Sequence, residues 1–144
     1  MALMSSDQVL EKIQKEIINS GRDTRYTTAA YLFVLNGLEF YLTKIGEKRH
    51  VTGQEFSRGL AEFAVKQFGP LALQVLTGWG IQTTDDFGNV VYNLIGIGLM
   101  TCREKDKPED FADVFNLEEF FKQQDYYPID KEHIRRVQQF RNLF

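Results

Sequence analysis

The two histidines and the one cysteine of this chain are the first candidates for metal binding or nucleophilic chemistry, and they are His50, His133 and Cys102. They lie far apart in the sequence, and no two of them have the short spacing that metal ligands usually share. We therefore expect no metal site. We expect His50 to order the turn before the helix that follows it, and Cys102 to be an inert thiol packed within a strand.

The acidic residues do not form a general acid/base pair. Asp85 and Asp86 are neighbours on a predicted helix, where consecutive side chains point about 100° apart. Asp23 and Arg25 stand in a polar connector, and we interpret them as a structural ion pair rather than a catalytic one. The sequence also has no nucleophile elbow, no phosphate-binding glycine loop and no His-Glu zinc helix. It therefore predicts a protein that is not an enzyme and has no cofactor.

The composition is that of an ordinary globular protein. Of 144 residues, 43% are hydrophobic and 26% are charged, and the net charge of −3 weighs against a nucleic-acid binder. The 12 Phe and 6 Tyr are expected in the core rather than in a base-stacking platform. The single cysteine fits a reducing compartment, and the chain has neither a run of roughly 20 apolar residues nor a signal peptide. The expected location is the cytoplasm.

Caps, glycines and hydrophobic spacing predict a mainly helical chain. Gly37, inside the most apolar helix, is expected to mark a close helix crossing. Thr52 and Glu55 have the spacing of a capping box, and Asn116 is expected to cap a short turn. The predicted helices cover residues 5–19, 27–45, 52–68, 70–77, 84–99 and 131–144.

A two-stranded β-hairpin is predicted at residues 100–117, where an alternating segment follows a polar tip at 104–110. Three helices followed by a hairpin is the order of a winged helix. The expected fold class is mainly α (α+β), a helical domain with a winged-helix-like core and one two-stranded β-hairpin. We expect a single domain over residues 1–121. Residues 122–144 are expected to form a linker and a C-terminal helix that packs on this domain or on a partner.

Several short motifs occur in the central part of the chain. They are DTRY at Asp23–Tyr26, HVTGQEF at His50–Phe56, QFGPLA at Gln67–Ala72, WGI at Trp79–Ile81, TDDFGNVVYNL at Thr84–Leu94 and DFADVFNLEEFF at Asp110–Phe121. Together they resemble an uncharacterised conserved bacterial family best known from planctomycetes and verrucomicrobia. The resemblance covers roughly residues 22–121 and implies a single conserved domain. It implies no activity, because the family has none established.

Nucleic-acid binding is the alternative function that a winged helix suggests. The start of the helix at 84–99 would approach the groove, but Asp85 and Asp86 stand there and the helix has no Lys or Arg. Contacts would have to come from basic residues of the hairpin and of the C-terminal helix, which are Arg103, Lys105, Lys107, Arg135, Arg136 and Arg141. The alternative is therefore a nucleic-acid-associated regulator that uses these two elements.

Protein binding is the main functional hypothesis. The C-terminal helix has apolar side chains on one side and arginines on the other, and its charge is opposite to that of the acid-rich segment 103–125. We therefore expect a non-enzymatic protein–protein interaction or homo-oligomeric module that does not enter a membrane. The predicted partner surface consists of Arg135, Arg136, Phe140, Arg141 and Phe144. A small-molecule pocket beneath the aromatic residues is a third hypothesis.

Overall fold

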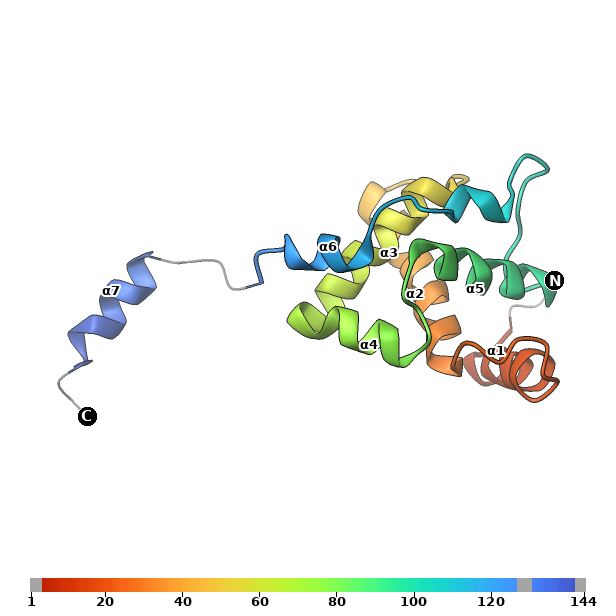
Figure 1. The fold of residues 1–144 in the computed structure, drawn as a ribbon, viewed down its shortest axis with the longest axis horizontal. Coiled ribbons are helices and arrows are strands. Elements are labelled where there is room, and N and C mark those ends of the chain that lie inside the picture. The colour runs from red at the N-terminus through yellow and green to blue at the C-terminus, as the bar shows by residue number, and fades with distance from the viewer. Residues whose placement is uncertain (1–3, 127–130, 142–144) are drawn as a thin grey trace.

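The computed structural model describes residues 4–126 and 131–141, and over these residues the protein is mainly helical (Figure 1). The elements in chain order are α1 (Ser6–Ile13), η1 (Gln14–Ile18), α2 (Thr28–Ile45), α3 (Gly53–Phe68), η2 (Gly69–Leu71), α4 (Ala72–Gly78), α5 (Thr84–Gly96), η3 (Pro108–Phe111), α6 (Leu117–Lys122) and α7 (Lys131–Gln139). η1 is a π-helical turn, and η2 and η3 are 3-10 turns. We call the part from α1 to α6 the body.

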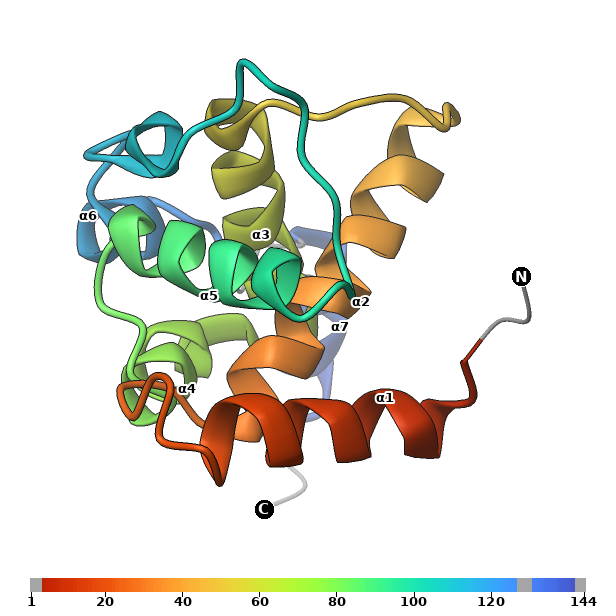
Figure 2. The same cartoon turned by 90° about the vertical axis from the view of Figure 1, so that its right-hand side faces the viewer.

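Helix α2 is the centre of the body because its side chains are apolar on nearly every side. It packs against α1, α3 and α5, an arrangement that can be followed in Figure 2. Tyr31 and Val34 of this helix are fully buried. A Cβ atom at Gly37 would stand only 2.4 Å from Cδ2 of Leu60 on α3. The close helix crossing predicted at Gly37 is therefore confirmed.

Side-chain caps begin α3 and α6 at the predicted places. The hydroxyl of Thr52 accepts a hydrogen bond from the backbone N–H of Glu55, and the Glu55 carboxylate accepts one from the Thr52 N–H at 3.0 Å. This confirms the predicted capping box. The side chain of Asn116 accepts from the backbone N–H of Glu119 at 2.9 Å and starts α6. In both caps the bonded residues are only three positions apart in the sequence, so the helix starts can be predicted without knowing the tertiary packing.

Aromatic side chains fill the space between α2, α3 and α4. Phe33 stacks on Phe63 with ring centroids 5.2 Å apart. Trp79, after α4, packs on Phe33 at 5.6 Å and on Phe68 at 5.5 Å. Phe33 and Phe63 are buried, so these rings belong to the core, as the sequence predicts, and not to a base-stacking platform.

The predicted β-hairpin at residues 100–117 is wrong, because the structure has no β-strand in residues 4–126 or 131–141. The chain instead runs irregularly after α5, makes the turn η3 and enters α6 (Figure 2). Helix α5 also ends earlier than predicted, at Gly96. The fold class is mainly α. The α+β class and the winged-helix core are both corrected, since a wing needs the two strands.

Hydrogen bonds to side chains of α5 explain why no hairpin forms. The backbone N–H of Asp113 donates to a carboxylate oxygen of Asp85 at 2.8 Å, and that of Val114 donates to the Thr84 hydroxyl at 3.1 Å. Asp113 also has a φ of 47°, a left-handed conformation that interrupts an extended strand. These N–H groups are satisfied by the start of α5 and are not available to a partner strand.

Phe111 holds the same segment against the body. It is 4% exposed and packs where α3 and α5 present glycines. A Cβ atom at Gly88 would stand 2.7 Å from Cβ of Phe111, and one at Gly53 would stand 3.0 Å from its ring. The alternating letters of this region therefore belong to a turn and a short helix that bury Phe111, Leu117 and Phe121.

Helix α7 lies apart from the body (Figure 1), and every side chain described in it is exposed. It covers Lys131–Gln139 of the helix predicted at 131–144. Phe144 and the side chain of His133 lie outside the described residues, so the predictions for them stay predictions. None of the described helices combines the length and the apolar character that a membrane crossing needs.

Candidate functional site

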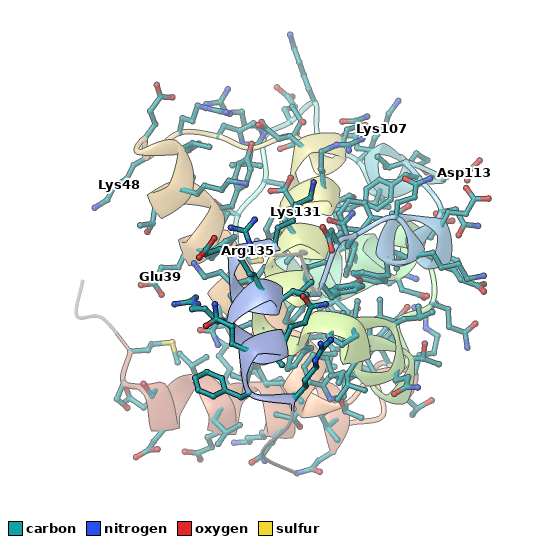
Figure 3. The ribbon with its side chains drawn as sticks, turned by 90° about the vertical axis from the view of Figure 1, so that its left-hand side faces the viewer. Glu39, Lys48, Lys107, Asp113, Lys131 and Arg135 are labelled. Carbon is teal, nitrogen blue, oxygen red and sulfur yellow. The ribbon has the colours of Figure 1, made fainter. Side chains whose placement is uncertain are left out.

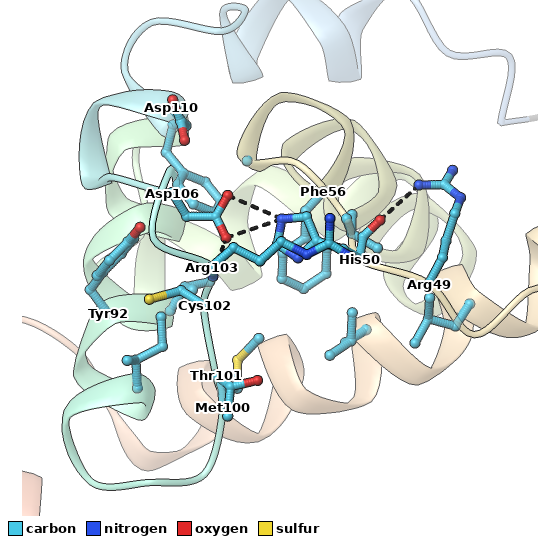
Figure 4. A pocket seen from close by; sticks show the side chains of 17 residues that line it. Arg49, His50, Phe56, Tyr92, Met100, Thr101, Cys102, Arg103, Asp106 and Asp110 are labelled. Carbon is cyan, nitrogen blue, oxygen red and sulfur yellow. Dashed lines mark hydrogen bonds and ion pairs between the residues drawn. The ribbon is translucent and has the colours of Figure 1, made fainter.

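A cavity lies between α2, α5 and the connectors that follow these two helices (Figure 4). Its volume is about 380 Å³, which falls in the range of small-ligand sites. Its apolar lining includes Leu38, Leu42, Phe56, Val91, Ile95 and Phe111. Its polar lining includes Arg49, His50, Tyr92, Cys102, Arg103 and Asp106. We call this cavity the α2–α5 pocket.

One rim of the α2–α5 pocket is held by His50 and Asp106. Nε2 of His50 lies 3.0 Å from the Asp106 carboxylate, and this bond joins the connector before α3 to the segment after α5. The backbone N–H of Arg103 donates to the same carboxylate and lowers the pKa of Asp106, with a further contribution from His50. Asp106 is therefore ionised at neutral pH. The sequence predicts that His50 orders the turn before α3, and the structure shows its side chain bonded instead to the segment after α5.

The prediction for Cys102 is wrong, because this residue is exposed and lies in irregular chain rather than in a strand. Figure 4 shows its sulfur pointing toward Tyr92 and away from His50. The two residues therefore do not form the nucleophile–base pair of a cysteine enzyme. Burial raises the pKa of Tyr92 to about 12, with a contribution from the neighbouring Cys102.

The two arginines of the pocket rim differ in their partners. Nη1 and Nη2 of Arg49 bind the two carboxylate oxygens of Glu55 at 2.8 and 3.0 Å, and Tyr41 donates to the same carboxylate at 2.6 Å. Arg49 lowers the pKa of Glu55 to about 2. For Arg103, the described part of the chain offers no carboxylate within ion-pair distance of the guanidinium. Arg103 therefore makes no ion pair in this part of the chain, although its charge also lowers the pKa of the nearby Asp106 carboxylate.

A second polar cluster joins the connector between α1 and α2 to helix α5. Asp23 is 8% exposed and accepts hydrogen bonds from Arg25 Nε at 3.0 Å, from Arg25 Nη2 at 2.8 Å and from Asn93 Nδ2 at 2.8 Å. The bonds from Arg25 lower the pKa of Asp23 to about 2. The predicted ion pair is confirmed, with a buried carboxylate and a guanidinium side chain that is 59% exposed.

The tyrosines of this cluster complete its hydrogen bonding. The Tyr26 hydroxyl donates to Asp86 and accepts from Asn89 at 2.9 Å, and Asn93 donates to the Tyr31 hydroxyl at 3.0 Å. Burial raises the pKa of Tyr26 and of Tyr31. We call this set the polar seam, and its members are Asp23, Tyr26, Tyr31, Asp86, Asn89 and Asn93. No buried side-chain polar atom in the described residues lacks a partner. The bonds of the seam join the connector before α2, and α2 itself, to α5.

The basic residues predicted to contact nucleic acid lie on two separate parts of the molecule. Arg103, Lys105 and Lys107 are exposed in the irregular segment after α5. The C-terminal residues Arg135, Arg136, Phe140 and Arg141 are exposed on α7 or directly after it. Figures 1 and 3 show α7 away from the segment that carries Lys107. The two basic groups therefore do not form one continuous surface. The hairpin on which the nucleic-acid alternative relied is also absent from the described residues.

Neither metal geometry nor comparison with known proteins identifies the site. In the ranges 4–126 and 131–141, no three His, Cys, Asp or Glu side chains are arranged to hold a metal ion. Comparison of the chain with protein-family models, with curated proteins and with solved structures gives no match. The resemblance to the planctomycete and verrucomicrobial family therefore stays a prediction.

Sequence reasoning missed the neighbours of His50 in the α2–α5 pocket. Asp106 is 56 residues from His50, and Arg103 was considered only as a nucleic-acid contact. The available signal was the spacing of Asp106 and Arg103, which suits a turn in which a carboxylate caps the N–H three residues before it. That signal predicts the turn but not the helix connector against which it packs.

Proposed function

We propose that this protein is a non-enzymatic interaction module that binds a second copy of its own chain through α7. The observation that carries the proposal is an apolar stripe that the described part of the chain leaves exposed. Ile134, Val137 and Phe140 are 46%, 56% and 57% exposed. Ile134 and Val137 are spaced three residues apart and so share one side of α7. Phe140 follows directly after the helix, and its backbone N–H bonds to the carbonyl of Val137. A stripe of this kind is the usual anchor of a helix that docks on another chain.

Charge complementarity supports a second copy as the partner. Lys131, Arg135, Arg136 and Arg141 face only one acid, Glu132, in the described part of the C-terminal helix region. The chain as a whole has a net charge of −3, so the body is acidic. Exposed acids on the body include Asp85, Glu109, Asp113, Glu118 and Glu119. A second copy therefore offers an oppositely charged surface, and reciprocal docking of two α7 helices would give a closed two-fold dimer.

The polar clusters of the body support a role without catalysis. The seam residues satisfy one another, and the Cys102 sulfur points away from His50, so these two residues do not form a nucleophile with an adjacent base. The single cysteine supports a cytoplasmic location, where thiols stay reduced. The proposal is therefore a cytoplasmic binding protein.

The test is light scattering coupled to size exclusion, applied to the full chain and to a chain that ends at Tyr126. We expect the full chain to have twice the monomer mass at about 50 mM salt and to dissociate partly at about 500 mM, where exposed charges are screened. The shortened chain should be monomeric at both salts. A full chain that is monomeric at low salt, or a shortened chain that is still dimeric, would contradict the proposal.

A further inference from the structure

We propose that the α2–α5 pocket binds a small apolar monocarboxylate, with the carboxylate on Arg103 and the apolar body between α2 and α5. This site is independent of α7 and of the interaction proposed above. The cavity of about 380 Å³ is large enough for such a ligand, because small-molecule sites begin at about 300 Å³.

The deep part of the pocket suits an apolar group. Phe56, Val91 and Phe111 are at most 5% exposed and form its floor together with Leu38 and Leu42 of α2. These five residues come from four different elements of the body, so the floor is set by core packing. An apolar ligand removes this surface from water, and this burial favours binding.

The mouth of the pocket suits a negative charge. Two carboxylates line the pocket, and both accept hydrogen bonds. Asp106 is bonded to His50 and to the backbone N–H of Arg103, and Asp110 accepts from the backbone N–H of Lys107. The rim cation Arg49 is occupied by Glu55. Arg103 reaches across the pocket from its segment in the direction of His50 (Figure 4). No described carboxylate lies within ion-pair distance of its guanidinium, and Asp106 is the carboxylate on which its charge acts. A planar guanidinium in this position can bind a carboxylate through two parallel hydrogen bonds.

The segment that presents Arg103 is held in place before any ligand arrives. The bond from His50 to Asp106 at 3.0 Å ties it to the connector before α3, and Phe111 ties its far end to α3 and α5. A preorganised rim lowers the entropic cost of binding. The apolar floor and the cationic rim thus select a ligand that has both an apolar body and a carboxylate.

The experiment is calorimetric titration of the full chain with octanoate, with octanol and with acetate. We expect octanoate to bind about tenfold or more tightly than either of the others, because octanol lacks the charge and acetate lacks the apolar body. The Arg103→Ala variant should lose the preference for octanoate over octanol. The control variant Lys105→Ala, at an exposed position of the same segment, should keep it.

Cys102 supplies a second measurement that locates the bound molecule. Its thiol is exposed and lines the pocket, so octanoate should slow its alkylation by iodoacetamide several-fold, and acetate should not. Folding of both variants is checked by circular dichroism. The proposal is overturned if octanoate and octanol bind equally well, if Arg103→Ala keeps the preference, or if octanoate binds without protecting Cys102. Absence of octanoate binding in the millimolar range overturns it as well.

Discussion

The body and α7 differ in what covers their apolar side chains. In the body, α2 is surrounded by α1, α3 and α5, and residues such as Tyr31 and Val34 are fully buried. In α7 and directly after it, the apolar residues Val137 and Phe140 are more than half exposed. The stability of the fold therefore lies in the body, and the apolar stripe of α7 contributes nothing to it until another surface covers the stripe.

The two regions also differ in how their charges are used. In the polar seam of the body, a hydrogen bond joins Asp23 and Asn93, which are 70 residues apart in the chain. Charge and hydrogen bonding there hold distant segments of the fold together. In α7 the single ion pair among described side chains, Arg135 with Glu132, lies within the helix itself. Changes in the body should therefore alter stability, whereas changes in α7 should alter association.

The largest effect on stability is expected from Gly80→Ala in the body. Gly80 has a φ of 98°, and a Cβ atom there would stand 2.1 Å from the carbonyl oxygen of Arg25. The left-handed conformation alone costs about 1–2 kcal/mol, and the backbone clash raises the expected loss to about 3 kcal/mol or more. Urea unfolding measures this loss. The control is Gly78→Ala, where a Cβ atom meets nothing within 4 Å, and an equal loss in both variants would contradict the argument.

A smaller loss is expected from Asp23→Asn in the polar seam. The variant keeps the shape of the side chain but removes the charge that binds Arg25, and it presents donors where Asn93 also donates. We expect a loss of about 1–3 kcal/mol in the free energy of unfolding. Asp125→Asn, at an exposed position after α6, is the matched control and should change it by no more than about 0.5 kcal/mol. Equal effects would show that the seam does not contribute as proposed.

The same residue predicts how stability depends on pH. The pKa of Asp23 is lowered from 3.8 to about 2 in the folded protein. Its contribution is therefore complete above about pH 4 and is lost as the pH falls from about 4 to about 2, because the unfolded state then binds the proton first. The stability difference between the native protein and Asp23→Asn should shrink over this interval. Urea unfolding at several pH values measures it, and a constant difference would rule out the titration of Asp23 as its cause.

The smallest effect on stability is expected in α7. The double variant Val137→Asp with Phe140→Asp changes side chains that are already exposed. The free energy of unfolding of the monomer should therefore change by no more than about 0.5 kcal/mol. The measurement is made at high salt and low protein concentration, which together favour the monomer. A loss of 2 kcal/mol or more, on the order of a buried apolar side chain, would mean that α7 packs on its own body.

The sequence predicted those parts of the fold that depend on neighbouring residues. The Thr52 and Asn116 caps and the Gly37 crossing follow from residue type and spacing within one helix, and all three are confirmed. The hairpin prediction failed because alternation over a few residues cannot reveal a distant partner. The backbone N–H of Val114 bonds to the Thr84 hydroxyl, 30 residues away. This bond takes the place of the backbone hydrogen bond that a hairpin strand would make.

The candidate site was less predictable for the same physical reason. His50 meets Asp106 across 56 residues, and the pocket exists only because α2, α5 and two connectors pack together. Cys102 was assigned to a strand and is instead exposed, an error that follows directly from the wrong hairpin. The amphipathic character of α7 is local and was visible in the sequence, whereas what covers it depends on a second surface.

The most direct test of the central claim is sedimentation velocity on two matched α7 variants. Val137→Asp with Phe140→Asp places two acids on the apolar stripe, and Gln138→Asp with Gln139→Asp places the same two charges beside it on exposed positions. At low salt and micromolar concentration, we predict that the full chain and the glutamine variant sediment as dimers and that the stripe variant sediments as a monomer. If both variants sediment like the full chain, the α7 stripe is not the interface and the account is contradicted.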